Sequence, residues 1–330
     1  MVLRASPGRT IEGRFYLLEE IGRGGMSVVF KAKDLANDGD TVAVKIPLPE
    51  FSSGLGAWSL FQREAEIGLR LQHPSIVRFI GPASKNREYV VTEYVTGKTL
   101  ASRIGNGRRL PEAEALRILS QVSAAVDYLH GEGFVHYDVK PGNVILCPDG
   151  SLRLIDFGTA HEAVHARFSL SAPAPPFATS DYMAPEQIRR RRGQTRVDVY
   201  ALGAMLYEML TGHTPFEGDD PYLVASAREI GDPLAPRSLC PEISEPVEEI
   251  VLRALRRNPA ERFATVAEMK AAVDDPSSVP LTQLAERLVP VTPRRRLLRN
   301  LRFAAITGLA PISGLVGLFL MVWWWLERRH

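Results

Sequence analysis

Two short segments hold residue types that could do chemistry together. One runs from His136 to Asn143 and reads His-Tyr-Asp-Val-Lys-Pro-Gly-Asn, and the other is an Asp-Phe-Gly tripeptide that begins thirteen residues later, at Asp156. Asp138 can accept the proton of an incoming hydroxyl group, and Lys140 can reach a phosphoryl group in transfer. Asn143 and Asp156 offer oxygen ligands of the kind that Mg²⁺ binds beside phosphates. The spacing therefore predicts phosphoryl transfer, in which the protein mainly aligns the reactants and neutralises charge.

A glycine-rich segment near the N-terminus has the composition that folds over phosphate groups. Positions 21–29 read Ile-Gly-Arg-Gly-Gly-Met-Ser-Val-Val, and glycines let a backbone turn tightly and present its amides to an anion. In a dinucleotide-binding fold this segment would open a helix. Here a β-rich run continues to Ala32, which favours a hairpin that encloses a nucleotide. The predicted nucleotide contacts in the hairpin are Ile21, Gly22, Gly24, Gly25, Ser27 and Val29.

Strand and helix patterns surround these segments and would position them. Thr41–Lys45 alternates like a strand, and residues 88–95 read as another. Between them, apolar residues from Leu60 to Leu71 have helical spacing. Pro111 opens a further helix that Gly131 ends. Its predicted buried stripe is Leu116, Leu119, Val122, Val126 and Leu129.

The segment after this helix is predicted to place the Asp-Phe-Gly tripeptide. Val144–Leu146 and residues 152–155 read as a short hairpin around Asp149, which would put Asp156 at its exit. The following stretch, residues 159–183, is polar, rich in Ala and Pro, and has no apolar period. It is expected to be irregular.

Taken in order, these motifs resemble those of bacterial eukaryotic-like Ser/Thr protein kinases. The resemblance runs from about Phe15 to Val273, and the irregular stretch resembles an activation segment closed by an Ala-Pro-Glu motif at Glu186. It implies an α+β fold of two lobes: a β-rich small lobe to about residue 92, a hinge at 93–97 and a helical large lobe over 98–273. ATP with Mg²⁺ or Mn²⁺ would bind between them, and protein Ser/Thr hydroxyl groups would accept the phosphate. Residues 1–14 would form an N-terminal lead.

The resemblance also assigns roles to single residues. Lys45 would contact the α- and β-phosphates and pair with a glutamate of the first helix. We assign Glu64 rather than Glu66 to that pair, because its distance of ten residues to the turn at Pro74 matches the family. Asp138 would be the base. The catalytic set is Asp138, Lys140, Lys45 and Glu64, the metal ligands are Asn143 and Asp156, and the remaining nucleotide contacts are Ala43, Thr92, Glu93 and Val95.

Other family positions carry structural expectations. Thr179 aligns with the residue that bonds the catalytic Asp and Lys, and Asp198 with the one that holds the backbone of the catalytic loop. Arg262 would pair with Glu186. Gly68 stands where a bulky apolar residue usually packs, and glycine inside a helix costs about 1 kcal/mol against alanine, so this helix is expected to be loose.

Position 137 departs from a common family pattern. Many members have an arginine before the catalytic Asp, where it meets a phosphate on the activation segment. Tyr137 cannot form that ion pair. Either Tyr137 packs the segment without phosphate, which we favour, or Arg153 or Arg167 substitutes. Ser169 and Ser171 would then be autophosphorylated as docking marks rather than as an activating switch.

Composition narrows the class of protein. The chain has 330 residues, of which 45% are hydrophobic, and a net charge of +2 gives no reason to expect a nucleic-acid partner. Cys147 and Cys240 are far apart and lack metal-ligand spacing, which predicts a reducing compartment. The first ten residues have no apolar run typical of a signal peptide.

The C-terminal part is predicted to join the protein to a membrane. Residues 274–302 are predicted to form a Pro-containing linker and a basic juxtamembrane segment, with a short amphipathic piece at 281–289. The following stretch, Phe303–Leu326, contains no charged residue. As a helix, 303–326 would be roughly 36 Å long and could cross a ~30 Å hydrocarbon core, leaving 327–330 outside. Small residues four apart, such as Ala310 and Gly314, would suit a homodimer. Five arginines precede the span and predict a single-pass cell-membrane protein with a cytoplasmic kinase domain: Arg294, Arg295, Arg296, Arg299 and Arg302.

Two functions remain possible at this point. One is a membrane-anchored Ser/Thr protein kinase. The other is a catalytically weak or dead nucleotide-binding scaffold that signals by docking. Scaffolds of that kind usually lack a catalytic residue, whereas Lys45, Asp138, Asn143 and Asp156 are all present. The sequence therefore favours the enzyme.

Overall fold

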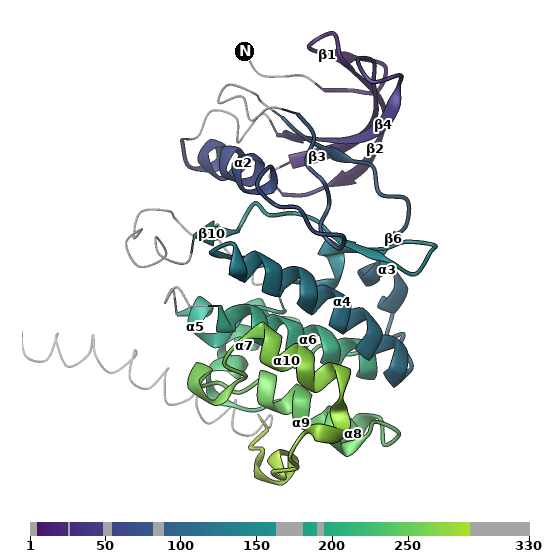
Figure 1. Ribbon diagram of the computed structural model, residues 1–330. Coiled ribbons are helices and arrows are strands. Elements are labelled where there is room, and N and C mark those ends of the chain that lie inside the picture. The colour runs from purple at the N-terminus through teal and green to yellow at the C-terminus, as the bar shows by residue number, and fades with distance from the viewer. Residues whose placement is uncertain are drawn as a thin grey trace, which may run out of the picture.

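The computed structural model describes residues 5–25, 27–48, 55–81, 89–162, 181–189 and 195–290. Within these ranges the chain forms two parts, one built on a sheet and the other on helices. Figure 1 shows a curved antiparallel sheet beside helix α2, and below them a larger group of helices around α4 and α6. The expected division into a β-rich and a helical lobe therefore appears in the structure.

The small lobe is a five-stranded sheet in the order β1-β2-β3-β4-β5. Alternating burial along β3 and β4 turns one side of each strand toward the core of the lobe, including Val28, Phe30 and Val44. Its strands are β1 (Thr10–Ile11), β2 (Phe15–Arg23), β3 (Ser27–Asp34), β4 (Asp40–Pro47) and β5 (Val90–Glu93). The sheet thus contains the predicted glycine-rich hairpin between β2 and β3, with no helix following the glycines.

The expected N-terminal lead is partly wrong. Ile11 pairs with Phe15 in an antiparallel ladder and is buried, so the end of the lead is the edge strand of the sheet. The chain reverses at Glu12 and Gly13, both of which have positive φ angles. This tight reversal lets β1 fold back on β2.

Helix α2 (Leu55–Gly68) begins and ends earlier than the expected range of 60–71. Its last residue, Gly68, is buried against the ring of Phe79. A Cβ added at Gly68 would lie 2.4 Å from three ring atoms of Phe79. The bulky group expected on the helix is thus supplied by a residue from outside it.

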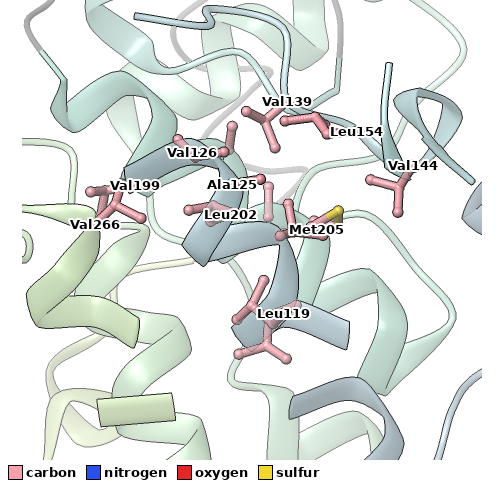
Figure 2. Close-up of a cluster of buried hydrophobic side chains, with 14 of the residues drawn as sticks. Leu119, Ala125, Val126, Val139, Val144, Leu154, Val199, Leu202, Met205 and Val266 are labelled. Atoms are coloured by element: carbon pink, nitrogen blue, oxygen red, sulfur yellow. The ribbon is translucent and has the colours of Figure 1, made fainter. Parts of the chain in front are cut away.

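The large lobe is centred on α6, which is buried along almost its whole length. All its residues except Arg196 and Glu208 are buried, as expected for a helix at the middle of a bundle. Figure 2 shows apolar residues of α4 and α6 meeting side chains from β8 and β9. The helices are α3 (Leu100–Ile104), α4 (Glu112–Gly131), α5 (Pro185–Ile188), α6 (Arg196–Thr211), α7 (Pro221–Ile230), α8 (Pro236–Leu239), α9 (Glu245–Ala254) and α10 (Val266–Asp274).

Several short strands lie outside the five-stranded sheet, and two of them, β8 and β9, form the predicted hairpin. β6 (Lys98–Thr99), β8 (Val144–Leu146) and β9 (Leu152–Leu154) make a three-stranded sheet, and β7 (Phe134–Val135) pairs with β10 (His161–Glu162). Strand β10 lies where only irregular chain was expected. Single 3₁₀ turns complete the described elements: Pro141–Asn143, Pro259–Glu261, Pro276–Ser278 and Leu284–Arg287.

Residues 275–290, which we call the C-terminal strap, are not the free linker that was expected. The buried carboxylate of Glu249 accepts hydrogen bonds from the backbone and hydroxyl of Thr282 and from the backbone of Leu284. Farther along, Asp232 accepts the amide of Val289 at 2.9 Å. These carboxylates fix the strap to the large lobe. The expected amphipathic piece at 281–289 is reduced to one 3₁₀ turn.

No helix within the described ranges is long and apolar enough to cross a membrane. The predicted span, 303–326, lies outside those ranges. It stays a prediction.

The contact between Gly68 and Phe79 makes a first prediction. Gly68→Ala should lower the free energy of unfolding by about 1–3 kcal/mol, because the added methyl group overlaps the Phe79 ring. Gly131→Ala is the matched control: it is also a helical glycine, but its Cβ would meet nothing within 4 Å, so this change should stabilise by up to about 1 kcal/mol. Chemical denaturation measures both. Equal stabilisation by the two changes would contradict the packing account.

Candidate functional site

The backbone of the segment from His136 to Asn143 is fixed by one buried carboxylate. Asp198, in α6, accepts the amides of His136 and Tyr137, each at 2.9 Å, and lies 2.7 Å from His130 Nε2. Burial acts to raise the pKa of Asp198, but these partners outweigh it and lower the pKa below its ordinary value. The predicted structural role of Asp198 is confirmed.

Two residues of the site adopt the left-handed backbone conformation that non-glycine residues usually avoid. Tyr137 has a φ of 66° and Asp156 one of 68°. Tyr137 is held on both sides of its peptide group, because Asp198 accepts its amide and Gln187 donates to its carbonyl oxygen at 3.1 Å. Such conformations persist where surrounding contacts determine them, and they are frequent at functional sites.

Asp138, Lys140 and Asn143 meet at the start of the 3₁₀ turn Pro141–Asn143. The Nζ of Lys140 lies 2.6 Å from Asp138 Oδ2. Asn143 Nδ2 donates to the backbone oxygen of Asp138 at 2.9 Å and also approaches its carboxylate, at 3.3 Å. The Asp138 carboxylate is therefore oriented by two donors and remains partly exposed, so it can meet a hydroxyl group.

Lys45 joins three elements at a single ammonium group. Its Nζ lies 2.8 Å from both carboxylate oxygens of Glu64 on α2 and 2.8 Å from Asp156 Oδ1, which follows β9. Glu64 is almost fully buried, whereas Glu66 is exposed on the same helix. The predicted choice of Glu64 over Glu66 as the partner of Lys45 is confirmed.

The charges of this triad are set by burial and by mutual contact. Burial alone would lower the pKa of Lys45, but Glu64 and Asp156 outweigh it and raise that pKa above its ordinary value. Burial raises the pKa of Glu64 to about 7, despite the opposing effect of Lys45. For Asp156 the Lys45 contact outweighs desolvation and lowers the pKa to about 2. Lys45 and Asp156 are thus charged, and Glu64 titrates near neutrality.

A column of rings connects α2 with the catalytic segment. The ring of Phe157 lies 5.3 Å from that of His136 and 6.0 Å from that of Phe79, between ring centroids. Phe79 in turn packs on Gly68 of α2. The position of Glu64, one turn earlier on α2, is therefore coupled through packing to the Asp-Phe-Gly tripeptide.

Several of the predicted nucleotide contacts of the small lobe lie side by side on adjacent strands. Gly22 pairs with Val29, and Val29 pairs with Lys45, so these residues lie across three adjacent strands. Ala43 pairs with Thr92 on β5. Ile21 is exposed beside them, and Glu93 and Val95 follow at the hinge.

The glycine-rich turn leaves room for an anion. A Cβ added at Gly25 would meet no atom within 4 Å, and one at Gly24 would meet only the backbone oxygen of Ser27, at 3.8 Å. With the Lys45 ammonium on the neighbouring strand, this open glycine backbone fits a polyphosphate. The residues present therefore suit the predicted nucleotide.

The donor set also suits Mg²⁺. Within the described ranges, no three His, Cys, Asp or Glu side chains form a metal centre of their own. Asn143 and Asp156 are nonetheless brought close, because the amide of Ile155 donates to the Asn143 carbonyl oxygen at 2.8 Å. One amide and one carboxylate, completed by phosphate oxygens and water, match the usual coordination of Mg²⁺.

Some sequence expectations about the activation segment lie outside the described residues, and others do not. Thr179, Arg167, Ser169 and Ser171 fall in the part that is not described. Arg153 is engaged elsewhere: its Nε lies 3.5 Å from Glu93 at the hinge, and its Nη1 donates to Leu152 and Ser151. Its role toward an activation-segment phosphate stays a prediction, because residues 163–180 lie outside the described ranges.

The end of the segment is anchored as predicted. Arg262 is buried and forms two hydrogen bonds of 2.7 and 2.8 Å with the carboxylate of Glu186. Sequence reasoning missed Gln187 and Arg228, which also hold this region. Their side chains act on residues far away in the sequence, so no local motif identifies them.

A family comparison agrees with this geometry. The model of the protein kinase domain matches residues 15–276. The chain belongs to the protein kinase family. Its kinase domain is of the bacterial eukaryotic-like Ser/Thr type, as predicted from the motifs.

Curated relatives support the same assignment. The chain is 35% identical over 266 residues to the serine/threonine-protein kinase PknB of Mycobacterium leprae, an alignment covering 79% of this chain and 42% of that protein. It is 34% identical over 271 residues to a probable serine/threonine-protein kinase of Streptomyces coelicolor, covering 81% and 40%. The match therefore spans about two fifths of the length of these relatives.

The raised pKa of Glu64 predicts a pH dependence of stability. Between its ordinary pKa of 4.5 and about 7, folded protein holds a proton on Glu64 that unfolded protein releases. This contribution to stability is therefore present below pH 4.5 and lost as the pH rises through 7. The free energy of unfolding of the wild type should fall relative to that of Glu64→Gln by on the order of 3 kcal/mol between pH 4.5 and 8.

Denaturant titrations at several pH values measure this difference. Glu66→Gln, on the exposed face of the same helix, is the matched control. Parallel curves for the wild type and Glu64→Gln would contradict the assigned titration.

Proposed function

We propose that the protein is a Ser/Thr protein kinase that transfers the γ-phosphate of ATP to Ser/Thr hydroxyl groups of proteins, including its own. The observation that carries this proposal is the Lys45 ammonium, held between Glu64 and Asp156 beside the glycine-rich strands. A cation fixed there from two sides is positioned for phosphate oxygens before any nucleotide binds.

The residues of the large lobe supply the acceptor side of the reaction. Asp138 would take the proton of the Ser or Thr hydroxyl as its oxygen bonds to the γ-phosphorus and ADP departs. Lys140, 2.6 Å from Asp138, would stabilise charge on the transferred group. Mg²⁺, held by Asn143 and Asp156, would neutralise phosphate charge.

A docking scaffold that binds nucleotide without turnover is the alternative. It needs the small-lobe contacts but not the base. The complete and oriented group of Asp138, Lys140 and Asn143 favours the enzyme, because a scaffold has no use for a carboxylate aligned by two donors.

Substitution of the base separates the two functions. Asp138→Asn should lower kcat for phosphate transfer to a generic protein acceptor by at least about a hundredfold, while ATP binding remains near that of the wild type. Asp149→Asn is the matched control, since Asp149 is an exposed turn carboxylate that accepts hydrogen bonds from the backbone and hydroxyl of Ser151. Near-normal turnover by Asp138→Asn would refute the assignment of the base, and an inactive wild type would favour the scaffold.

We also propose that Phe303–Leu326 anchors the kinase domain to the cell membrane, with that domain in the cytoplasm. Support comes from 24 consecutive uncharged residues after five arginines. The strap adds to this, because it fixes the chain to the large lobe up to Pro290. Only the twelve residues 291–302 then separate the domain from the span, and fully extended they reach about 40 Å. Protein substrates near the membrane would therefore be favoured.

Fractionation and protease protection test the anchor. The full chain should sediment with membranes and resist extraction by alkaline carbonate, whereas a chain ending at Pro290 should not sediment. Protease added to intact cells should leave the kinase domain uncut. Recovery of the full chain in the soluble fraction would refute the anchor, and cleavage of the domain in intact cells would reverse the orientation.

A further inference from the structure

Arg228, on α7, is the largest fully buried side chain among the described residues. Its guanidinium reaches the chain just before the Ala-Pro-Glu motif. Nη2 donates to Asp181 Oδ1 at 3.0 Å, and Nη1 lies 3.4 Å from the backbone oxygen of Met183. Asp181 is about half exposed, so its carboxylate lies at the boundary between this buried cation and solvent.

Burial of a guanidinium group is unfavourable unless the group is paired and hydrogen-bonded. Burial lowers the pKa of Arg228, and the opposing influences come from Tyr200 and Asp181. Replacing a buried ion pair by apolar residues is often neutral or stabilising, so such a pair is weak evidence for a role in stability. What this pair does provide is geometry: the two donors of Arg228 fix residues 181 and 183 relative to α7.

Tyr182, which lies between Asp181 and Met183, is held by a different helix. The hydroxyl of Tyr182 is hydrogen-bonded to the carboxylate of Glu208 on α6. Residues 181–183 are thus attached to two helices, and α5 follows at once, where Glu186 meets Arg262. Thr179, which the family resemblance aligns with a partner of the catalytic Asp, precedes Asp181 by only two residues.

We propose that Arg228 is a positioning residue that holds the end of the activation segment ready to receive a protein acceptor without phosphorylation. This proposal rests on the proposed kinase function. Phosphorylation orders a segment by adding an anion that an arginine can bind. Here the carboxylate of Asp181 takes the place of the phosphate, and α7 supplies the arginine that binds it. The arrangement would compensate for Tyr137, which cannot bind a phosphate as an arginine does.

The role predicts a selective kinetic effect. In Arg228→Met, KM for myelin basic protein, used as a generic acceptor, should rise about tenfold, equivalent to about 1.4 kcal/mol, while KM for ATP stays within twofold of the wild type. Arg228→Lys, which keeps the charge, should recover most of the loss. Arg14→Met is the control: it breaks a partly buried pair with Asp34 in the small lobe and should leave acceptor KM unchanged.

Phosphorylation is tested on the same enzyme. Wild-type protein treated with phosphatase should keep its low acceptor KM, because the contact between Arg228 and Asp181 contains no phosphate. An acceptor KM that rises tenfold on dephosphorylation would overturn phosphate-independent positioning. An unchanged acceptor KM in Arg228→Met, or equal increases for acceptor and ATP, would overturn the role of Arg228.

Hydrogen exchange gives a readout that does not depend on activity. The amides of residues 181–184 and 186–189 should exchange at least tenfold faster in Arg228→Met and in Asp181→Asn. The second change preserves the shape of the side chain and keeps the proposal testable if Arg228→Met fails to fold. Unchanged exchange in Asp181→Asn would overturn the proposal. A wild type that transfers no phosphate but shows the exchange effect would refute the kinase function and leave the positioning contact established.

Discussion

The ammonium group of Lys45 lies where three separately folded parts of the chain converge. Strand β4 carries the lysine, α2 carries Glu64 and the loop after β9 carries Asp156. A buried cation is unfavourable unless it is paired, so this contact defines where α2 and the loop must lie relative to the sheet. The rings of Phe79 and Phe157 transmit the same constraint through packing, because they connect Gly68 of α2 with His136.

In the large lobe, too, buried charged side chains hold irregular segments of the chain in place. Asp198 fixes the catalytic segment, Arg262 fixes the Ala-Pro-Glu motif, and Glu249 fixes the C-terminal strap. In each case the charged group lies on a regular helix or packs beside one. It forms hydrogen bonds with backbone or side-chain groups of a segment that has no regular hydrogen-bond ladder of its own. Phosphate transfer needs several loops held at once, and buried polar contacts supply that precision where packing of apolar side chains cannot.

Much of the site could be predicted because its residues occur in motifs with fixed spacing. The Lys45–Glu64 pair, the role of Asp198 and the Glu186–Arg262 pair all follow from such motifs. The packing of Phe79 on Gly68 could not be predicted, since it depends on how closely a strand-like segment approaches α2. The β1 strand was missed because a two-residue strand depends on the positive φ angles of Glu12 and Gly13. The strap was mistaken for a linker because its partners, Glu249 and Asp232, lie far away in the sequence.

A double-mutant cycle on Lys45 and Glu64 tests the central claim most directly, which is that their contact prepares the lysine for phosphate transfer. The measured quantity is kcat/KM for ATP in the wild type, Lys45→Met, Glu64→Gln and the double variant. If Glu64 acts through Lys45, the double variant should be little worse than Lys45→Met, with a coupling free energy of about 1–3 kcal/mol. Independent, additive losses from the two substitutions would contradict the account.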